Sequence, residues 1–269
     1  MNLDQLIKKY SAHPLFGELV KNHNTTEVQH VHLDGLRGSS IALLIAALYK
    51  HEKFNAVFVL NDREEAAYFA NDLENLLGTT HVMFFPASYK KTGDPTSLDN
   101  SNVLQRAEVL NRISKNPAGN LIITHTESFY EKVTTKHSLH QNTFDVKRGS
   151  VMSQDFLSEF LDDNDFVQTD FVYEAGQYAM RGGIMDVYSF AFELPFRIEF
   201  FDDRIESIRT FDPSNQLSVQ QMDVISIIPN IQTKLLKQTK EHFLNFIGNN
   251  YRIWMRDYDS ACESISALH

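Results

Sequence analysis

Residues 195–201 read Pro-Phe-Arg-Ile-Glu-Phe-Phe, and this stretch decides how the second half of the chain folds. Its apolar residues alternate with Arg197, Glu199 and Phe201. Because successive side chains of a strand point to opposite faces, the pattern predicts a strand with one face toward a core and the other toward solvent. Phe201 is then an aromatic side chain on the charged face, beside Arg197.

A turn signal after this strand predicts a hairpin, and a glycine pair stands before an earlier strand. Downstream, Asp202-Asp203 is a turn candidate that leads into a second strand over 204–211. Upstream, Arg181-Gly182-Gly183 precedes a strand over 184–188. The paired glycines predict a bulge or a close approach of two backbones, and they place Arg181 at the rim of the sheet.

An exposed aromatic residue flanked by two arginines has the composition of a protein-binding hot spot. The alternative interpretation is purely structural. Single apolar side chains are common on protein surfaces, and a surface arginine often only solvates a face. The residue pattern alone leaves both interpretations open.

A longer block of sequence carries a family resemblance. Residues 174–183, Glu-Ala-Gly-Gln-Tyr-Ala-Met-Arg-Gly-Gly, and residues 194–201, Leu-Pro-Phe-Arg-Ile-Glu-Phe-Phe, resemble a module shared by two bacterial DNA-repair proteins, UvrB and the transcription-repair coupling factor (Mfd). In both families this module docks onto UvrA. The resemblance implies that Arg181, Arg197 and Phe201 form the UvrA contact, because all three residue types match the family's contact positions.

The first half of the chain alternates strand-like and helix-like segments, which predicts an α/β domain with a mostly parallel sheet. The expected strands there cover 27–34, 55–60, 81–85 and 121–124, and the expected helices cover 41–49, 63–77, 103–113 and 127–133. Further on, the expected helices cover 153–161, 234–246 and 257–268, and a strand is expected over 251–255.

The resemblance also implies a domain organisation. Residues 1–142 would form a degenerate UvrB-like domain 1A with a helicase-like (RecA-like) parallel sheet. Residues 143–228 would be an inserted small α+β domain with an antiparallel sheet, the UvrA-binding domain 2. Residues 229–269 would be the start of domain 1B, returning to the first domain.

A degenerate phosphate loop follows the first expected strand. A phosphate loop is Gly, four residues, Gly-Lys and then Ser or Thr. Without the lysine nothing bridges the outer phosphates, and without the last hydroxyl a magnesium ion loses a ligand. A glycine turn into a capped core helix is the simpler interpretation, which leaves weak anion binding open but excludes ATP hydrolysis. The loop positions, of which the last three depart from the pattern, are Gly35, Gly38, Ser39, Ser40, Ile41 and Ala42.

Two departures point away from UvrB itself. UvrB keeps an intact phosphate loop and carries a long, aromatic-bearing hairpin that inserts into DNA. Here the interval from 86 to 107 is short and polar, with Tyr89 as its only aromatic residue. The alternative function, a UvrB-like ATP-dependent DNA-damage recognition protein, would require ATP binding at 35–42 and DNA engagement near 86–107. A DNA-binding module is disfavoured by the net charge of −10.

Composition limits the remaining classes. The chain has 269 residues, 42% of them hydrophobic, enough for two or three domains with real cores. The single Cys262 excludes a disulfide framework and suits a reducing cytoplasm. No run approaches the roughly 18 apolar residues of a membrane span. His30 and His32 would share a strand face, but no further ligand at metal-binding spacing accompanies them, so we expect no metal and no cofactor.

These observations together lead us to expect a cytoplasmic, non-enzymatic module that recruits UvrA. The resemblance implies an N-terminal fragment of a coupling factor, which links stalled RNA polymerase to nucleotide excision repair. The parent protein would be an ATP-dependent translocase that contacts RNA polymerase and double-stranded DNA through regions absent from this chain. The resemblance also implies that the parent's C-terminal domain can mask the UvrA contact.

Overall fold

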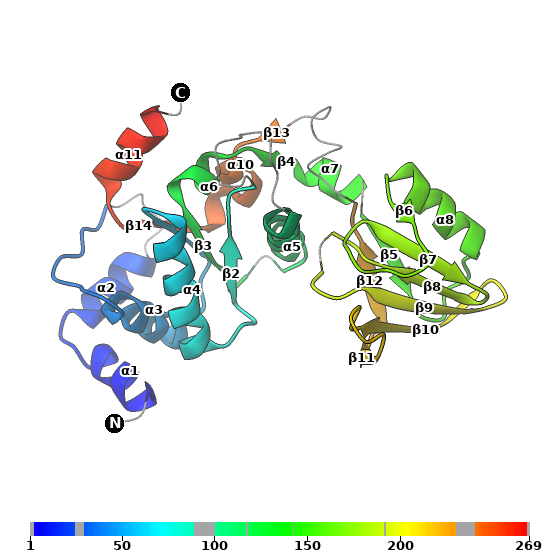
Figure 1. The fold of residues 1–269 in the computed structure, drawn as a ribbon. Coiled ribbons are helices and arrows are strands. Elements are labelled where there is room, and N and C mark those ends of the chain that lie inside the picture. The colour runs from blue at the N-terminus through cyan, green and yellow to red at the C-terminus, as the bar shows by residue number, and fades with distance from the viewer. Residues whose placement is uncertain are drawn as a thin grey trace. The chain divides into compact units, whose positions relative to one another are not determined.

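The computed structural model describes residues 3–24, 30–88, 100–116, 118–141, 143–190, 192–229 and 240–267. The chain divides into two compact units. Unit 1 comprises residues 1–86, 116–130 and 247–269, and unit 2 comprises 87–115 and 131–246. A parallel sheet with helices in unit 1 and a mainly antiparallel sheet in unit 2 confirm the expected fold class (Figure 1).

Unit 1 is built on a four-stranded parallel sheet with the order β14-β1-β3-β2. Its middle strands are buried along their whole length, as expected for a parallel sheet covered on both faces. The strands are β1 (Ala56–Leu60), β2 (Val82–Phe85), β3 (Leu121–His125) and β14 (Arg252–Met255). The helices are α1 (Leu3–Ser11), α2 (Phe16–Asn24), α3 (Ser40–His51), α4 (Arg63–Leu77), α6 (Thr126–Tyr130) and α11 (Tyr258–Ala267).

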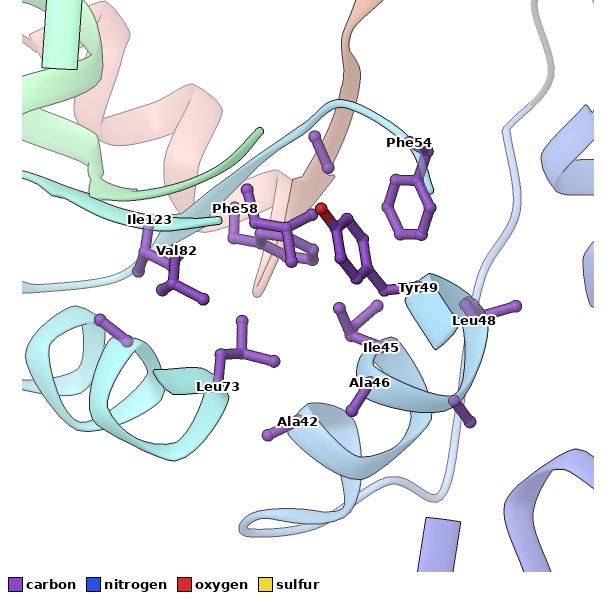
Figure 2. Packing of buried hydrophobic residues seen from close by; sticks show 14 of the residues in the cluster. Ala42, Ile45, Ala46, Leu48, Tyr49, Phe54, Phe58, Leu73, Val82 and Ile123 are labelled. Carbon is purple, nitrogen blue, oxygen red and sulfur yellow. The ribbon is translucent and has the colours of Figure 1, made fainter. Parts of the chain in front are cut away.

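The core of unit 1 lies where α3 and α4 pack against this sheet. Ile45 and Tyr49 of α3 and Leu73 of α4 gather near Phe58 of β1 in Figure 2. The Tyr49 hydroxyl donates a hydrogen bond of 2.7 Å to the carbonyl oxygen of Gly119. Burial raises the pKa of Tyr49 to about 12, so this phenol stays protonated and keeps its bond within the core.

The first expected strand, 27–34, is wrong where the structure describes it. Residues 25–29 lie outside the described residues, and 30–39 contain no strand. Val31 and Leu33 are exposed in this stretch. Its apolar residues alternate with polar ones, but the described part of this stretch pairs with no strand of the sheet β14-β1-β3-β2.

Later elements of the parallel region agree in part. The strand at 251–255 and the helix at 257–268 are confirmed as β14 and α11. The helix expected over 127–133 ends at Tyr130, because the next residues form β4 (Val133–Thr134). The helix expected over 234–246 is also wrong in its last part, because Lys240–Glu241 form the strand β13, which pairs with β4. The short helix α10 (Phe243–Ile247) and the 3₁₀ helix η1 (Gly248–Asn250) follow. Residues 230–239 lie outside the described residues.

Unit 2 contains a six-stranded sheet with the order β11-β10-β9-β8-β7-β6, antiparallel except for the β6–β7 pair. The turn predicted from the sequence at 202–203 is present, and a second two-residue turn at 182–183 joins β7 and β8. The sheet strands are β6 (Val167–Gln168), β7 (Gln177–Arg181), β8 (Ile184–Val187), β9 (Phe196–Phe201), β10 (Arg204–Phe211) and β11 (Ser218–Gln221). The other elements are α5 (Asn100–Lys115), α7 (Lys136–Gln141), α8 (Gln154–Asp163) and the pair β5 (Phe144–Lys147) and β12 (Val224–Ile227).

One face of the six-stranded sheet forms the core of unit 2. Its inward residues, among them Phe196, Ile198 and Phe200, cluster with Leu157 and Leu161 of α8. The helix α8 begins at its predicted cap, where the Ser153 hydroxyl accepts a hydrogen bond of 3.2 Å from the amide of Phe156. The opposite face of the sheet carries most of the charged side chains, together with a small buried cluster of Val172, Ala179 and Phe211. Within the described ranges, no helix combines the length and the apolar character that crossing a membrane requires.

Candidate protein-interaction face

The strand register brings the three candidate contact residues to one face of the sheet. Residues directly opposite each other on neighbouring strands point to the same side. Arg181 pairs with Ile184 on β8, and Ile184 pairs with Glu199 on β9. Arg197 and Phe201 each lie two residues from Glu199 along β9, so they point to the same side as Glu199. We call this side the outer face; its residues are Arg181, Ile184, Asp186, Arg197, Glu199, Phe201, Arg204, Ser207 and Arg209.

Phe201 lies exposed on the outer face, with 70% of its surface accessible. It ends β9, immediately before Asp202, whose φ of 51° forms the hairpin turn. Across the sheet it pairs with Arg204, which in turn bridges to the exposed Val151. Phe201 thus has an apolar neighbour one strand beyond Arg204, contributed by a residue that the sequence pattern did not single out.

The glycine pair 182–183 brings two backbone segments close together. Gly182 has a φ of 58°, in the left-handed region that favours glycine. A Cβ atom on Gly183 would lie 2.9 Å from the carbonyl oxygen of Phe200, so the predicted close approach of two backbones is confirmed. The amide of Phe200 donates a hydrogen bond of 2.7 Å to the carbonyl of Gly183, which fixes β8 and β9 at this point.

Arg197 is held firmly and is only 13% exposed. Its Nε and Nη2 atoms donate to the two carboxylate oxygens of Asp186, at 2.7 and 2.8 Å. Nη1 donates to the backbone carbonyl of Gln216 and Nη2 to its side-chain oxygen, at 3.2 and 3.0 Å. The guanidinium lies 4.3 Å from the ring centre of Phe211. The hydrogen bond to Asp186 raises the pKa of Arg197 above its ordinary value.

Arg181 binds the same carboxylate and is more exposed, at 35%. Its Nη2 donates to Oδ2 of Asp186, the oxygen that also accepts from Nη2 of Arg197. Its Nη1 donates to the backbone carbonyl of Asp170 at 3.0 Å. The guanidinium lies 4.9 Å from the ring centre of Phe171, a geometry suited to a cation–π interaction. Asp186 itself has no exposed surface.

A second ion pair lies on the same face. Arg209 donates to Glu199, and the Ser207 hydroxyl donates to the other oxygen of that carboxylate at 2.5 Å. These bonds, the one from Arg209 first, lower the pKa of Glu199 below its ordinary value of 4.5. The outer face therefore carries four arginines and two carboxylates, which gives it a local positive excess on a chain of net charge −10.

The degenerate phosphate loop folds as a turn into a core helix. Gly35 and Gly38 adopt φ angles of 81° and 54°. The helix α3 begins at Ser40, whose hydroxyl accepts a hydrogen bond of 2.8 Å from the amide of Arg37. Ser39 stands at the cap position, but its side chain makes no capping hydrogen bond, so the side-chain cap expected from the sequence is not formed there. The reason is that Ser40 Oγ is oriented back toward Arg37.

The residues at the lysine and hydroxyl positions of that loop belong to the core of unit 1. Ile41 packs against the cluster of Figure 2, and Ala42 is fully buried in it. This region places apolar side chains where nucleotide binding would need a cation and a metal ligand. In the interval from 86 to 107, residues 89–99 lie outside the described residues. From residue 100 onward the interval belongs to the start of α5.

Metal-ligating residues do not cluster in the described part of the chain, where no three His, Cys, Asp or Glu side chains come together. His30 and His32 fall in the stretch that lacks the expected strand, so they do not share a strand face.

Comparisons with known proteins identify what this chain is similar to. Residues 144–232 match the family described as the UvrB interaction domain, and this span contains every residue of that face. The chain is 27% identical to the transcription-repair-coupling factor of Escherichia coli (strain K12) over 198 residues, which is 73% of this chain and 17% of the relative. It is 27% identical to that of Myxococcus xanthus over 218 residues, 79% of this chain and 18% of the relative.

A third similar protein is the transcription-repair-coupling factor of Bacillus subtilis (strain 168), 25% identical over 197 residues, 73% of this chain and 17% of the relative. The chain thus spans less than a fifth of the length of these curated relatives. The resemblance expected from the sequence, to the UvrB-like N-terminal module of the bacterial transcription-repair coupling factor, is confirmed.

Proposed function

We propose that this chain is a non-catalytic module that recruits UvrA and so connects stalled RNA polymerase to nucleotide excision repair. The contact residues in this proposal are Arg181, Arg197 and Phe201. The observation that carries it is the strand register, which gathers these three side chains on the outer face of the sheet. That face lies within the span that matches the UvrB interaction domain.

The chemistry of the outer face fits a partner with carboxylates around an apolar pocket. Phe201 is exposed enough to be buried on binding, and aromatic residues and arginines are the residue types that most often dominate binding energy. Arginine forms bidentate hydrogen bonds with carboxylates, which adds geometric selectivity to attraction. Because the exposed Val151 lies near Phe201, we include it at the edge of the contact.

The absence of catalysis is part of this proposal. The apolar Ile41 and Ala42 at the degenerate loop support it, because a nucleotide would find neither a lysine nor a magnesium-binding hydroxyl there. We further propose the functional division 1–142, 143–228 and 229–269, with 143–228 as the docking domain. The span of the family match, 144–232, supports the middle segment. RNA polymerase and double-stranded DNA would be contacted by other parts of a longer, cytoplasmic protein.

Calorimetric titration of the purified chain into UvrA tests the proposal. The variants are Arg181→Ala, Arg197→Lys and Phe201→Ala, and the matched control is Tyr68→Ala. Tyr68 is an aromatic residue of unit 1 that is 75% exposed, so its loss should leave binding unchanged. We expect the contact variants to bind at least about 30-fold more weakly, the effect of removing a hot-spot side chain. Lack of binding by the wild-type chain, or equal binding by folded variants, contradicts the proposal.

A second titration with ATP addresses the non-catalytic part. We expect no heat of binding for MgATP at micromolar protein concentrations. A micromolar dissociation constant, lost on replacing residues of the 35–42 loop, would instead favour an ATP-dependent recognition protein.

A further inference from the structure

Asp186 is an unusual member of the outer face, because it is a carboxylate with no exposed surface on the side of the sheet that faces solvent. Both of its oxygens accept hydrogen bonds from guanidinium groups. Oδ2 is shared by Arg181 and Arg197, so one buried anion connects two cations that lie on different strands. A buried charge is tolerated only where it is paired and hydrogen-bonded, and here both conditions are met.

Each arginine is also fixed from two other sides. Arg197 is bonded to Gln216 and lies over the ring of Phe211. Arg181 is bonded to the carbonyl of Asp170 and lies over the ring of another phenylalanine, Phe171. Apart from Phe211, which ends β10, these contacts come from loops, and Asp186 is the residue common to both arrangements.

The two arginines differ in the donors they retain. A guanidinium has five N–H groups. Within the described residues, Arg197 makes four hydrogen bonds and Arg181 makes two. Arg181 therefore keeps most of its donors for a partner and is also the more exposed of the two.

We propose that Asp186 is the positioning residue of the outer face. It holds Arg181 in the orientation in which its remaining donors meet a carboxylate of the partner, and it holds Arg197 as a brace beside it. This inference rests on the proposed function, since the partner in question is UvrA. It assigns different tasks to the two arginines, which the family resemblance treats alike.

The inference makes a prediction opposite in sign to that of simple electrostatics. If only net charge mattered, removal of the Asp186 charge would strengthen attraction to an acidic partner. If positioning matters, both guanidiniums become mobile and must be ordered on binding. Ordering one such side chain weakens binding by roughly 2- to 12-fold, so we expect Asp186→Asn to weaken it by about 10-fold or more.

The test is calorimetric binding of the full chain to UvrA, with Asp186→Asn and the control Asp223→Asn. Asp223 forms an exposed ion pair of 3.1 Å with Arg148, away from the outer face, so its variant should bind like wild type. In an Arg181→Ala background we expect Asp186→Asn to cost clearly less than in the wild-type chain, because only Arg197 is then left for it to hold. Binding of Asp186→Asn that equals or exceeds wild type, or an undiminished cost in that background, overturns the inference.

Nuclear magnetic resonance gives a readout that does not depend on UvrA. In the wild-type chain the Nε proton of Arg197 is bonded to a buried carboxylate, so its exchange with water should be slow. Asp186→Asn should accelerate this exchange at least about 10-fold, while backbone amide signals of the sheet stay in place. Unchanged exchange in the folded variant overturns the positioning role even if UvrA binds. Failure of the wild-type chain to bind UvrA overturns the proposed function, and with it the identity of the partner.

A second variant covers the case in which Asp186→Asn does not fold. Gln216→Gly removes the side-chain oxygen that accepts from Arg197 and leaves the buried carboxylate intact. Gln216 has a φ of 63°, which glycine adopts without strain, so this variant should fold. We expect faster Nε exchange at Arg197 and binding weakened by about 2- to 5-fold. Exchange and affinity that both equal the wild-type values contradict the brace role of Arg197.

Discussion

Phe200 and Phe201 offer a matched pair for separating folding from binding. They are neighbours on β9 and chemically identical, but the pleat points them to opposite faces. Phe200 is 9% exposed and belongs to the core of unit 2, whereas Phe201 is 70% exposed on the outer face. Replacing each with alanine should therefore affect different properties.

The expected magnitudes follow from the buried areas. A phenylalanine side chain buries about 150–250 Å² when fully enclosed, at about 25 cal/mol per Å². Phe200 buries roughly nine-tenths of that area, so Phe200→Ala should lower the free energy of unfolding by about 4 kcal/mol. Phe201 buries roughly three-tenths, which limits the loss to about 1.5 kcal/mol, and the Cβ atom that alanine retains lowers it further.

Binding should show the reverse order. Truncation of an anchor residue costs about 2 kcal/mol or more in binding free energy, which is about 30-fold in the dissociation constant. Phe201→Ala should lose this much affinity for UvrA with nearly normal stability. Any Phe200→Ala protein that remains folded should bind almost normally, because its side chain points away from the outer face.

Urea unfolding followed by tyrosine and tryptophan fluorescence gives the stability of each variant, and calorimetry gives the affinity. If Phe201→Ala were destabilised as much as Phe200→Ala, the assignment of faces on β9 would be wrong. If Phe201→Ala bound UvrA like wild type, the face assignment would stand and Phe201 would not be an anchor.

Three further predictions concern stability. Burial raises the pKa of Tyr178 to about 12 from 10.0, so the unfolded chain loses this proton at a lower pH than the folded chain. The free energy of unfolding that the wild-type chain loses between about pH 9 and about pH 11 should therefore be smaller in Tyr178→Phe, as measured by urea unfolding. The pKa of Glu199 is lowered below 4.5, so its contribution to folding stability is present above that value and disappears as the pH falls. Glu199→Gln should therefore reduce the drop in melting temperature between about pH 6 and about pH 3. An unchanged drop would contradict the stabilising role of this ion pair. Gly183→Ala should cost about 1–3 kcal/mol, since its Cβ would meet a backbone oxygen at 2.9 Å, whereas the control Gly17→Ala, in α2 with nothing within 4 Å, should be neutral or stabilising.

The sheet of unit 2 was predictable because its signals are local. The alternation along β9 assigns Phe201 to the charged face, and the short turn at 202–203 fixes the hairpin that β9 forms with β10. The strand expected over 27–34 shows the limit of the same signal. Alternating residues form a strand only when they pair with a neighbour, and the described residues of this stretch, 30–34, are paired with no strand.

Asp186 could not be recognised from the sequence for a related reason. In an isolated strand, an aspartate on the polar face would be expected to stay solvated. Its burial depends on contacts distant in the chain, namely Arg197 on the next strand and the loop positions Asp170 and Gln216 that fix the two arginines. Spacing along one strand contains no information about these loops.

This arrangement bears on which partner the face selects. Two unpaired arginines held side by side would repel each other, and they would favour any dense negative charge, including the phosphates of DNA. With Asp186 between them, the pair carries a single net positive charge and a fixed set of donors on Arg181. Directed donors favour a planar carboxylate at a defined position over a chain of phosphates. Under the proposed function, the same buried anion that weakens the electrostatic field of the outer face would favour a protein partner over DNA.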